Sequence, residues 1–175
     1  MSILMLLIKL LVGLFIVRFH ANAYRLGYNP LLAKLNQLTN PLVQPLSRLL
    51  PHPRWDFGAL FCALILAILT TCILMRSLPS GIIIGILHSF FGTWLDIILY
   101  SLIIVVIGSW LQADPRQPVM QILLCCHEWL MAPLRRVIPP LGMIDFTPIV
   151  ALLGIQLCKY LLAVLGNKLL LTLAT

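Results

Sequence analysis

Acidic side chains are scarce in this sequence: aspartate and glutamate together account for five of its 175 residues. The sequence also lacks a glycine-rich phosphate loop, a pair of neighbouring carboxylates, and a serine or cysteine nucleophile set beside a histidine in a motif. Enzyme active sites are built from groups of these kinds. We therefore expect no catalytic residue and no enzymatic activity.

The shortage of acidic residues leaves a formal net charge of +7. The basic residues are dispersed between apolar stretches and form neither a run nor a patch interleaved with aromatic residues. Membrane topology explains such a distribution better than nucleic-acid binding does. We therefore expect no nucleic-acid partner.

The five cysteines include no CxxC pair, which argues against a disulfide or zinc framework. Residues 125–128 (CCHE) form the one cluster that resembles a metal site. Adjacent residues on a helix point about 100° apart and rarely converge on one ion. We expect no metal and no cofactor, with zinc or haem ligation by this cluster as the alternative.

Hydrophobic residues dominate the chain. They make up 61% of it, charged residues make up 10%, and the mean hydropathy is +1.05. A helix needs about 20 apolar residues to cross a bilayer. Four stretches qualify, at about residues 3–19, 57–75, 89–110 and 147–166, and they predict an all-α polytopic membrane protein with four transmembrane helices.

Two of these stretches have alternative interpretations. The first could be a signal peptide, but no charge precedes it and no small-x-small cleavage site follows it, so we expect it to be retained. The third belongs to an apolar run, residues 82–110, that is longer than one crossing needs. Either the helix projects from the membrane, or residues 81–92 form a separate interfacial or re-entrant piece.

A leucine stripe precedes the second crossing. Its members recur every three or four positions, which is the spacing of one helical face: Leu31, Leu35, Leu38, Leu42, Leu46 and Leu49. Pro41 and Pro45 make an unbroken helix unfavourable. We expect a short amphipathic helix on the membrane surface, followed by a proline-punctuated turn.

The chain resembles itself at a shift of 88 positions. Residues 45–51 (PLSRLLP) then match residues 133–139 (PLRRVIP), and one further position aligns Asp56 with Asp145. We interpret this match as a duplication, with one repeat at 1–76, a connector at 77–88 and a second repeat at 89–175. The residues of the repeated turn are Pro45, Arg48, Pro51, Asp56, Pro133, Arg136, Pro139 and Asp145.

Lysine and arginine are concentrated in the segments that connect the two crossings within each repeat. Only Arg76 and Lys168 lie on the opposite side of the predicted crossings. The positive-inside rule places the connecting segments in the cytoplasm and both termini in the periplasm.

Three ionisable residues, Lys9, Asp96 and Lys159, lie within the predicted crossings. Such residues are costly in hydrocarbon unless they are paired or hydrated. Helical rise places all three at one depth, so we expect Asp96 to pair with Lys9 or Lys159. An ion or proton pathway is one alternative, and unpaired side chains that snorkel to the interface are another.

Each repeat also places an arginine eight or nine positions before an aspartate that starts a crossing. These are Arg48 before Asp56 and Arg136 before Asp145. A turn that folds back would bring each guanidinium against its carboxylate. The alternative is that the arginines contact anionic lipid headgroups.

The second repeat carries motifs of a known family: SW at 109–110, PLRR at 133–136 and GMIDFTPI at 142–149. With these motifs the chain resembles the YggT (YlmG-related) membrane proteins of bacteria and plastids. The first repeat is more divergent, since it lacks the Ser-Trp pair and the Thr-Pro after its Asp-Phe. The resemblance implies links to osmotic tolerance, division or nucleoid phenotypes, or haem attachment in plastids, with no shared biochemical activity.

Together these features predict a bacterial inner-membrane protein that acts in assembly, cell-envelope organisation or stress tolerance. The expected partners are the lipid bilayer, other membrane proteins and a second copy of the chain. The alternative function is a subunit of an ion or small-solute pathway centred on Asp96.

Overall fold

The structure is a computed structural model that describes residues 3–49, 52, 55–74, 81–138 and 145–174. These residues form six helices and their connections, without a strand among them. The helices are α1 (Ile3–Ala23), α2 (Pro30–Ser47), α3 (Phe57–Leu74), α4 (Gly81–Trp110), α5 (Pro118–Val137) and α6 (Thr147–Ala174). The all-α fold class predicted from the sequence is confirmed.

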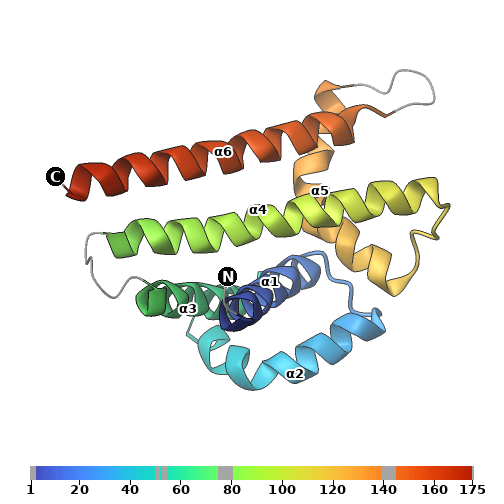
Figure 1. Cartoon of the computed structure of the whole chain (residues 1–175). Helices are drawn as coiled ribbons and strands as arrows, with labels where there is room; N and C mark the ends of the chain where they lie inside the picture. Colours follow the sequence, from blue (N-terminus) through green and yellow to red (C-terminus); the bar gives the residue numbers. More distant parts are fainter. Residues whose placement is uncertain (1–2, 50–51, 53–54, 75–80, 139–144, 175) are drawn as a thin grey trace.

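The long helices pack in two pairs, α1 with α3 and α4 with α6, and α4 lies between α6 and the α1/α3 pair (Figure 1). Each pair has its own apolar core. One core contains Val12, Ile16 and Ala63, together with Val43 from α2. The other contains Leu102 and Ile155, together with Met131 from α5. Each short helix thus contributes a side chain to the core beside it.

Asn29 joins the beginnings of the two short helices. Its side-chain oxygen accepts hydrogen bonds from the backbone nitrogens of Leu31 and Leu32, which caps α2. Its side-chain nitrogen donates to the carbonyl of Pro118 at 2.8 Å and to the amide oxygen of Gln121 at 3.0 Å. The first turns of α2 and α5 therefore lie at the same end of the bundle.

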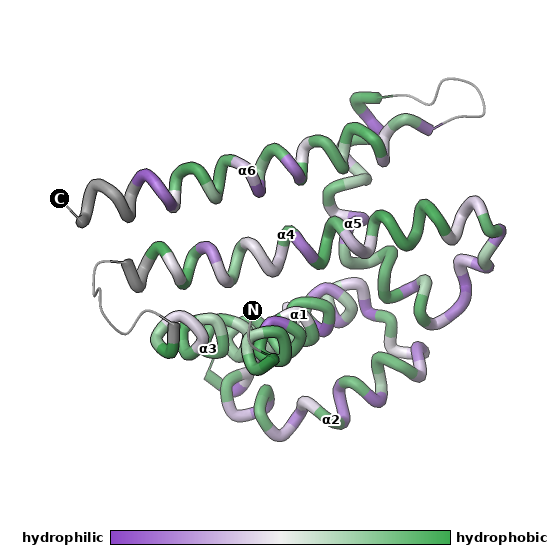
Figure 2. Tube along the Cα trace, viewed as in Figure 1, coloured by the Kyte–Doolittle hydropathy of each residue, from purple (hydrophilic) through white to green (hydrophobic). Residues whose placement is uncertain are grey.

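Three of the described helical segments are long and apolar enough to cross a membrane: Ile3–Ala23, Ile84–Trp110 and Thr147–Lys168. In Figure 2 hydrophobic positions dominate these helices and α3, whereas hydrophilic positions recur along α2. The chain is a membrane protein. The 18 residues of α3 rise about 27 Å, slightly less than a hydrocarbon core of about 30 Å, so a fourth crossing stays a prediction.

The apolar run before Trp110 is one continuous helix. Its 30 residues begin at Gly81 and rise about 45 Å, so the helix extends beyond one hydrocarbon thickness. The interpretation of residues 81–92 as a separate interfacial or re-entrant piece is wrong. The predicted connector at 77–88 is likewise helix from Gly81 onward, and residues 77–80 lie outside the described part of the chain.

Prolines do not end the short helices. Pro41 and Pro45 lie inside α2, and Pro133 lies inside α5, so the prediction that Pro41 and Pro45 interrupt the helix is wrong. Each proline removes one backbone hydrogen bond. Because Pro41 and Pro45 are four positions apart and exposed, the carbonyls that they leave free can be solvated, and the helix bends instead of stopping (Figure 1).

Gly58 permits close packing between α2 and α3. A Cβ atom added there would lie 2.1 Å from Ser47 Oγ and 2.7 Å from the carbonyl oxygen of Val43. Gly58→Ala should therefore lower the free energy of unfolding by about 1–3 kcal/mol, the usual cost of overpacking. Gly154→Ala is the control, because an added Cβ there meets nothing within 4 Å and should stabilise α6 by up to about 1 kcal/mol. Equal effects in detergent unfolding would contradict this account.

Candidate functional site

Arg18 is the centre of a buried polar cluster at the junction of α1, α2 and α3. Its side chain is 6% exposed, and its Nε lies 2.9 Å from Asp56 Oδ2. Its other nitrogens donate to the carbonyl of Asn36 at 3.2 Å, to the Thr39 hydroxyl and to Asn40 Oδ1 at 2.9 Å. A guanidinium carries five donors in a rigid fork, and here four acceptors satisfy it. One arginine thus fixes the position of α2 against the bundle.

Asp56 completes this cluster from the start of α3. Its Oδ2 also accepts a hydrogen bond from Asn22 Nδ2 at 2.8 Å, and its Oδ1 accepts one from the backbone nitrogen of Ala59 at 3.2 Å. The second of these bonds caps the helix. The carboxylate therefore neutralises Arg18 and starts α3 at the same time.

The predicted Arg48–Asp56 pair is wrong, because in the structure Asp56 pairs with Arg18. Arg48 is exposed at the end of α2, whereas Arg18 reaches the carboxylate from the neighbouring helix α1. In the sequence Arg18 stands only near the end of the first predicted crossing, at about residues 3–19. The missed signal is the group of Asn36, Thr39 and Asn40, which recurs at helical spacing beside the leucine stripe on α2.

In the second repeat Asp145 pairs with Arg135, the residue before the predicted Arg136. Arg135 Nε lies 3.8 Å from Asp145 Oδ2, and Arg135 Nη1 lies 3.2 Å from Glu128 Oε1, whereas Arg136 was expected at Asp145. Arg135 and Asp145 are more than 40% exposed, and exposed pairs contribute about 0–1 kcal/mol. The turn residues Pro51 and Pro139 lie outside the described residues.

A cavity of about 400 Å³ opens between four helices in the part of the bundle that the apolar segments form. In Figure 2 pale and purple positions interrupt the green along the first half of α4, which forms one wall. The lining residues are Met5, Lys9, Thr70, Thr71, Gly85, His88, Ser89, Gly92, Thr93, Asp96, Lys159 and Leu162. The structure thus brings all three predicted intramembrane ionisable residues to one cavity.

Within this cavity Asp96 pairs with Lys159. Lys159 Nζ lies 2.5 Å from Asp96 Oδ1, and each side chain is 31% exposed. Lys9 lines the same cavity but has neither a hydrogen bond nor an ion pair among the described residues. The three ionisable residues that were predicted at one depth therefore form one ion pair and leave one additional ammonium group.

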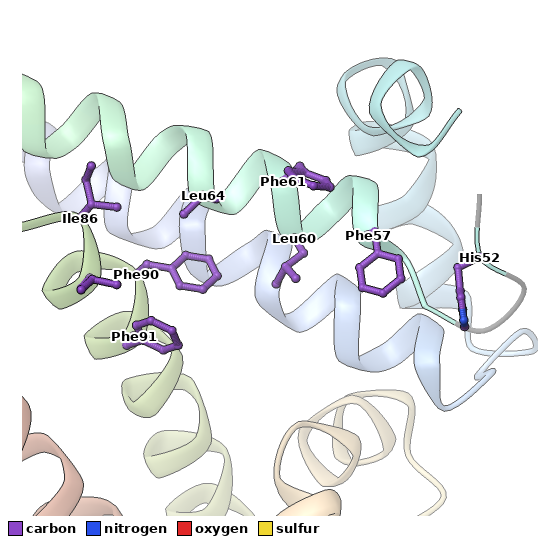
Figure 3. A pocket seen from close by; sticks show the side chains of 9 residues that line it. His52, Phe57, Leu60, Phe61, Leu64, Ile86, Phe90 and Phe91 are labelled. Atoms are coloured by element: carbon purple, nitrogen blue, oxygen red, sulfur yellow. The ribbon is translucent and has the colours of Figure 1, made fainter. Parts of the chain in front are cut away.

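A larger cavity, of about 730 Å³, lies between α3 and α4. Figure 3 shows Phe57, Leu60, Phe90 and Phe91 along it, with His52 at one end. No charged side chain lines it. Because an apolar groove of this kind suits lipid chains and offers no chemistry, the polar cavity is the better candidate for a functional site.

His20, at the end of α1, is held by aromatic rings. Its ring stacks on Trp129 at 6.4 Å between centroids and meets Trp94 edge-on at 5.4 Å. Its Nε2 atom is buried without a hydrogen-bond partner in the described part of the chain. These contacts give His20 a role in packing α1 against α4 and α5.

The side chains of the CCHE cluster have separate partners. Cys125 and Cys126 both donate to the carbonyl of Ile122, at 3.0 and 3.2 Å, and Glu128 pairs with Arg135. The neighbouring Cys125 thiol, together with burial, raises the pKa of the Cys126 thiol, which disfavours the thiolate that a metal needs. Among the residues that the structure describes, no three His, Cys, Asp or Glu side chains converge as a metal site.

His127 is buried on α5, and its Nδ1 lies 3.1 Å from Ser101 Oγ of α4. Because that hydroxyl donates to the carbonyl of Ile98, the ring nitrogen is the donor between them. Burial, reinforced by the charge of Arg135, lowers the pKa of His127 to about 4. The imidazole is therefore neutral in the folded protein at pH 7.

Acid should destabilise the protein through His127. The unfolded chain binds a proton near the ordinary pKa of 6.5, whereas the folded chain does not until about pH 4, so stability falls as the pH drops from about 6.5 to 4. Between pH 7.5 and 5 this loss amounts to about 2 kcal/mol. His127→Gln should remove that part of the pH dependence. Unfolding titrations at both pH values test this, and equal slopes in the two proteins would contradict it.

The comparisons with known proteins identify the family. The chain matches the CCB3/YggT family over residues 1–77 and 84–166. It belongs to this family. It is 31% identical to the "Uncharacterized protein YggT" of Escherichia coli over 130 residues, which cover 72% of this chain and 68% of the relative. An uncharacterised protein of Pseudomonas aeruginosa is 31% identical over 146 residues, which cover 77% and 72% of the two chains. No solved structure matches the chain.

The two segments matched by the CCB3/YggT family divide the polar sites between them. Arg18 and Asp56 both lie in the first segment, and Asp96 and Lys159 both lie in the second. Each matched segment therefore contains both members of its own ion pair. The resemblance to YggT proteins predicted from the motifs is confirmed.

Proposed function

We propose that this YggT-family protein is a non-enzymatic assembly or stress-tolerance factor that holds α2 as a docking surface for another membrane protein. One observation carries the proposal: one face of α2 is fixed by the Arg18 cluster, while the other carries an exposed leucine row. The row consists of Leu31, Leu38, Leu42 and Leu49, which are 40%, 79%, 63% and 75% exposed.

Rigidity is what makes the leucine row suitable for recognition. A surface that is already ordered loses little conformational entropy when a partner binds. Thr39 and Val43, on the adjoining face of α2, are buried against the bundle, so α2 cannot turn its exposed leucines inward. A row of exposed aliphatic side chains beside polar residues suits an apolar partner surface at the membrane boundary.

We further propose that the chain is an inner-membrane protein of two repeats, with four crossings and with α2 and α5 on the cytoplasmic side. The family match falls in two segments of similar length, and Asn29 holds the beginnings of both short helices together. Two pairs of core residues also occupy equivalent positions of the repeats: Val43 and Met131 differ by 88 positions, and Cys62 and Ala151 differ by the 89 positions that align Asp56 with Asp145.

Site-specific photo-crosslinking in intact cells tests the docking surface. A photoreactive residue placed at Leu38 or Leu42 should capture one and the same membrane protein, and that capture should disappear when the other leucine is changed to serine. The control position is Leu153, an exposed residue of α6. Lipid adducts alone at all three positions, or the same proteins at Leu153, would reject the assembly function.

A subunit of an ion or small-solute pathway is the second candidate, and the polar cavity with its Asp96–Lys159 pair favours it. Purified protein in liposomes should then support a flux that Asp96→Asn abolishes. An unchanged flux in Asp96→Asn liposomes, or no flux in wild-type ones, would reject this candidate.

A further inference from the structure

The charges of the polar cavity do not balance. Lys159 is neutralised by Asp96 at 2.5 Å, but Lys9 faces the same space without a partner among the described residues. The lining therefore carries two ammonium groups and one carboxylate. An unpaired charge at this depth costs free energy unless water or a ligand compensates it.

The polar groups around Lys9 favour an anion over a cation. The one carboxylate is already occupied by Lys159, so a cation would meet two ammonium groups and no free acid. Thr70, Thr71 and Thr93 donate their hydroxyl protons to carbonyls of their own helices and leave the ammonium groups as the strongest donors. His88 and Ser89 add neutral groups that can donate hydrogen bonds.

The cavity also has room for such a ligand. Its volume of about 400 Å³ lies within the range of small-molecule sites, about 300–1,000 Å³. A Cβ added at Gly92, on the α4 wall, meets nothing within 4 Å, so this wall is open. Lys9 lies six residues from the start of α1, about 9 Å along the helix, close enough to that end of the bundle for entry.

We propose that this cavity binds an anionic group of phosphate or carboxylate type, with Lys9 as its charge partner and the Asp96–Lys159 pair as its wall. The anion can be a free small molecule or the headgroup of an anionic lipid, since both present the same chemistry to Lys9. The site is independent of the α2 docking surface. Binding also does not require transport, so it can be present where no flux is observed.

Two binding measurements on the full-length protein in neutral detergent distinguish the sources. The first follows the thermal unfolding midpoint against inorganic phosphate at constant ionic strength. The second counts bound phosphatidylglycerol by native mass spectrometry, with phosphatidylcholine as the reference lipid. Stabilisation by phosphate identifies a free anion, and retention of phosphatidylglycerol alone identifies a lipid headgroup.

Lys9→Met is the decisive variant because it removes an unpaired charge and should not impair folding. We expect it to weaken binding by about tenfold or more, the usual value of one charged hydrogen bond, or to remove one bound phosphatidylglycerol. Lys34→Met removes the same charge from the exposed face of α2 and should leave cavity binding unchanged. Binding that is absent from the wild type, or equal in Lys9→Met and wild type, overturns the proposal.

Asp96→Asn should have the opposite effect to Lys9→Met on anion binding, a result that a purely structural role of Asp96 would not produce. It frees Lys159 and raises the positive charge of the cavity, so affinity for the anion should increase by about tenfold or more. Weaker binding by a monodisperse Asp96→Asn protein would contradict the charge argument. If Asp96→Asn does not fold, the Lys9→Met and Lys34→Met pair still decides the proposal.

Discussion

Replacing Arg18 with methionine should remove most of the folded protein. The substitution leaves Asp56 charged without its cation and withdraws the donor from Asn36, Thr39 and Asn40. Breaking a buried ion pair by removing one partner costs about 3–5 kcal/mol, a large share of the 5–15 kcal/mol that stabilises an ordinary domain. The measurements are the monodisperse fraction after extraction and the detergent-induced unfolding curve.

Arg48→Met is the matched control, since it removes the same charge from an exposed site at the end of α2. It should change stability by less than about 0.5 kcal/mol. The double variant Arg18→Met/Asp56→Asn should recover part of the loss, because no uncompensated charge remains. If Arg18→Met and Arg48→Met unfolded alike, the cluster would not hold α2 in place.

Asp96→Asn should produce the second large effect. It leaves Lys159 as a second unpaired ammonium beside Lys9 in an apolar part of the bundle. The expected loss is about 2–3 kcal/mol, below the value for a fully buried pair because each side chain is 31% exposed. Unfolding in mixed micelles without added anion measures it.

A double-mutant cycle isolates this pair. Asp96→Asn/Lys159→Met removes both charges and should restore stability to within about 1 kcal/mol of the wild type. Asp96→Asn/Lys9→Met also removes one ammonium group but should restore less, because Lys159 remains without its carboxylate partner. Equal rescue by the two lysine substitutions would show that Asp96 has no preferred partner.

Sequence reasoning located the intramembrane charges but not their pairing. Helical rise alone placed Lys9, Asp96 and Lys159 at one depth, because depth depends only on position along a helix. The choice of partner depends on which helices are neighbours, and the packing of α4 along α6 selects Lys159. No local pattern in a single sequence encodes that neighbourhood.

Arg18 shows a different reason for failure. At the end of an apolar run an arginine commonly marks the interface, and this interpretation does not depend on the rest of the chain. Its actual partners come from α2 and the start of α3, between 18 and 38 positions away. Pro41 and Pro45 led to a wrong prediction for a similar reason. The sequence shows that each proline costs a backbone hydrogen bond, but it does not show that both prolines lie on the exposed face of α2, where the free carbonyls can be solvated.

The separation between Asp96 and Lys159 has a consequence for biogenesis. The two residues are 63 positions apart, and ribosomes add about 5–20 residues per second. The carboxylate of α4 therefore leaves the ribosome roughly 3–13 s before its lysine does. During that interval Lys9 has already been synthesised and Lys159 has not. The ammonium group of Lys9, which is unpaired in the finished protein, is therefore the first counter-charge available to Asp96 in the nascent chain.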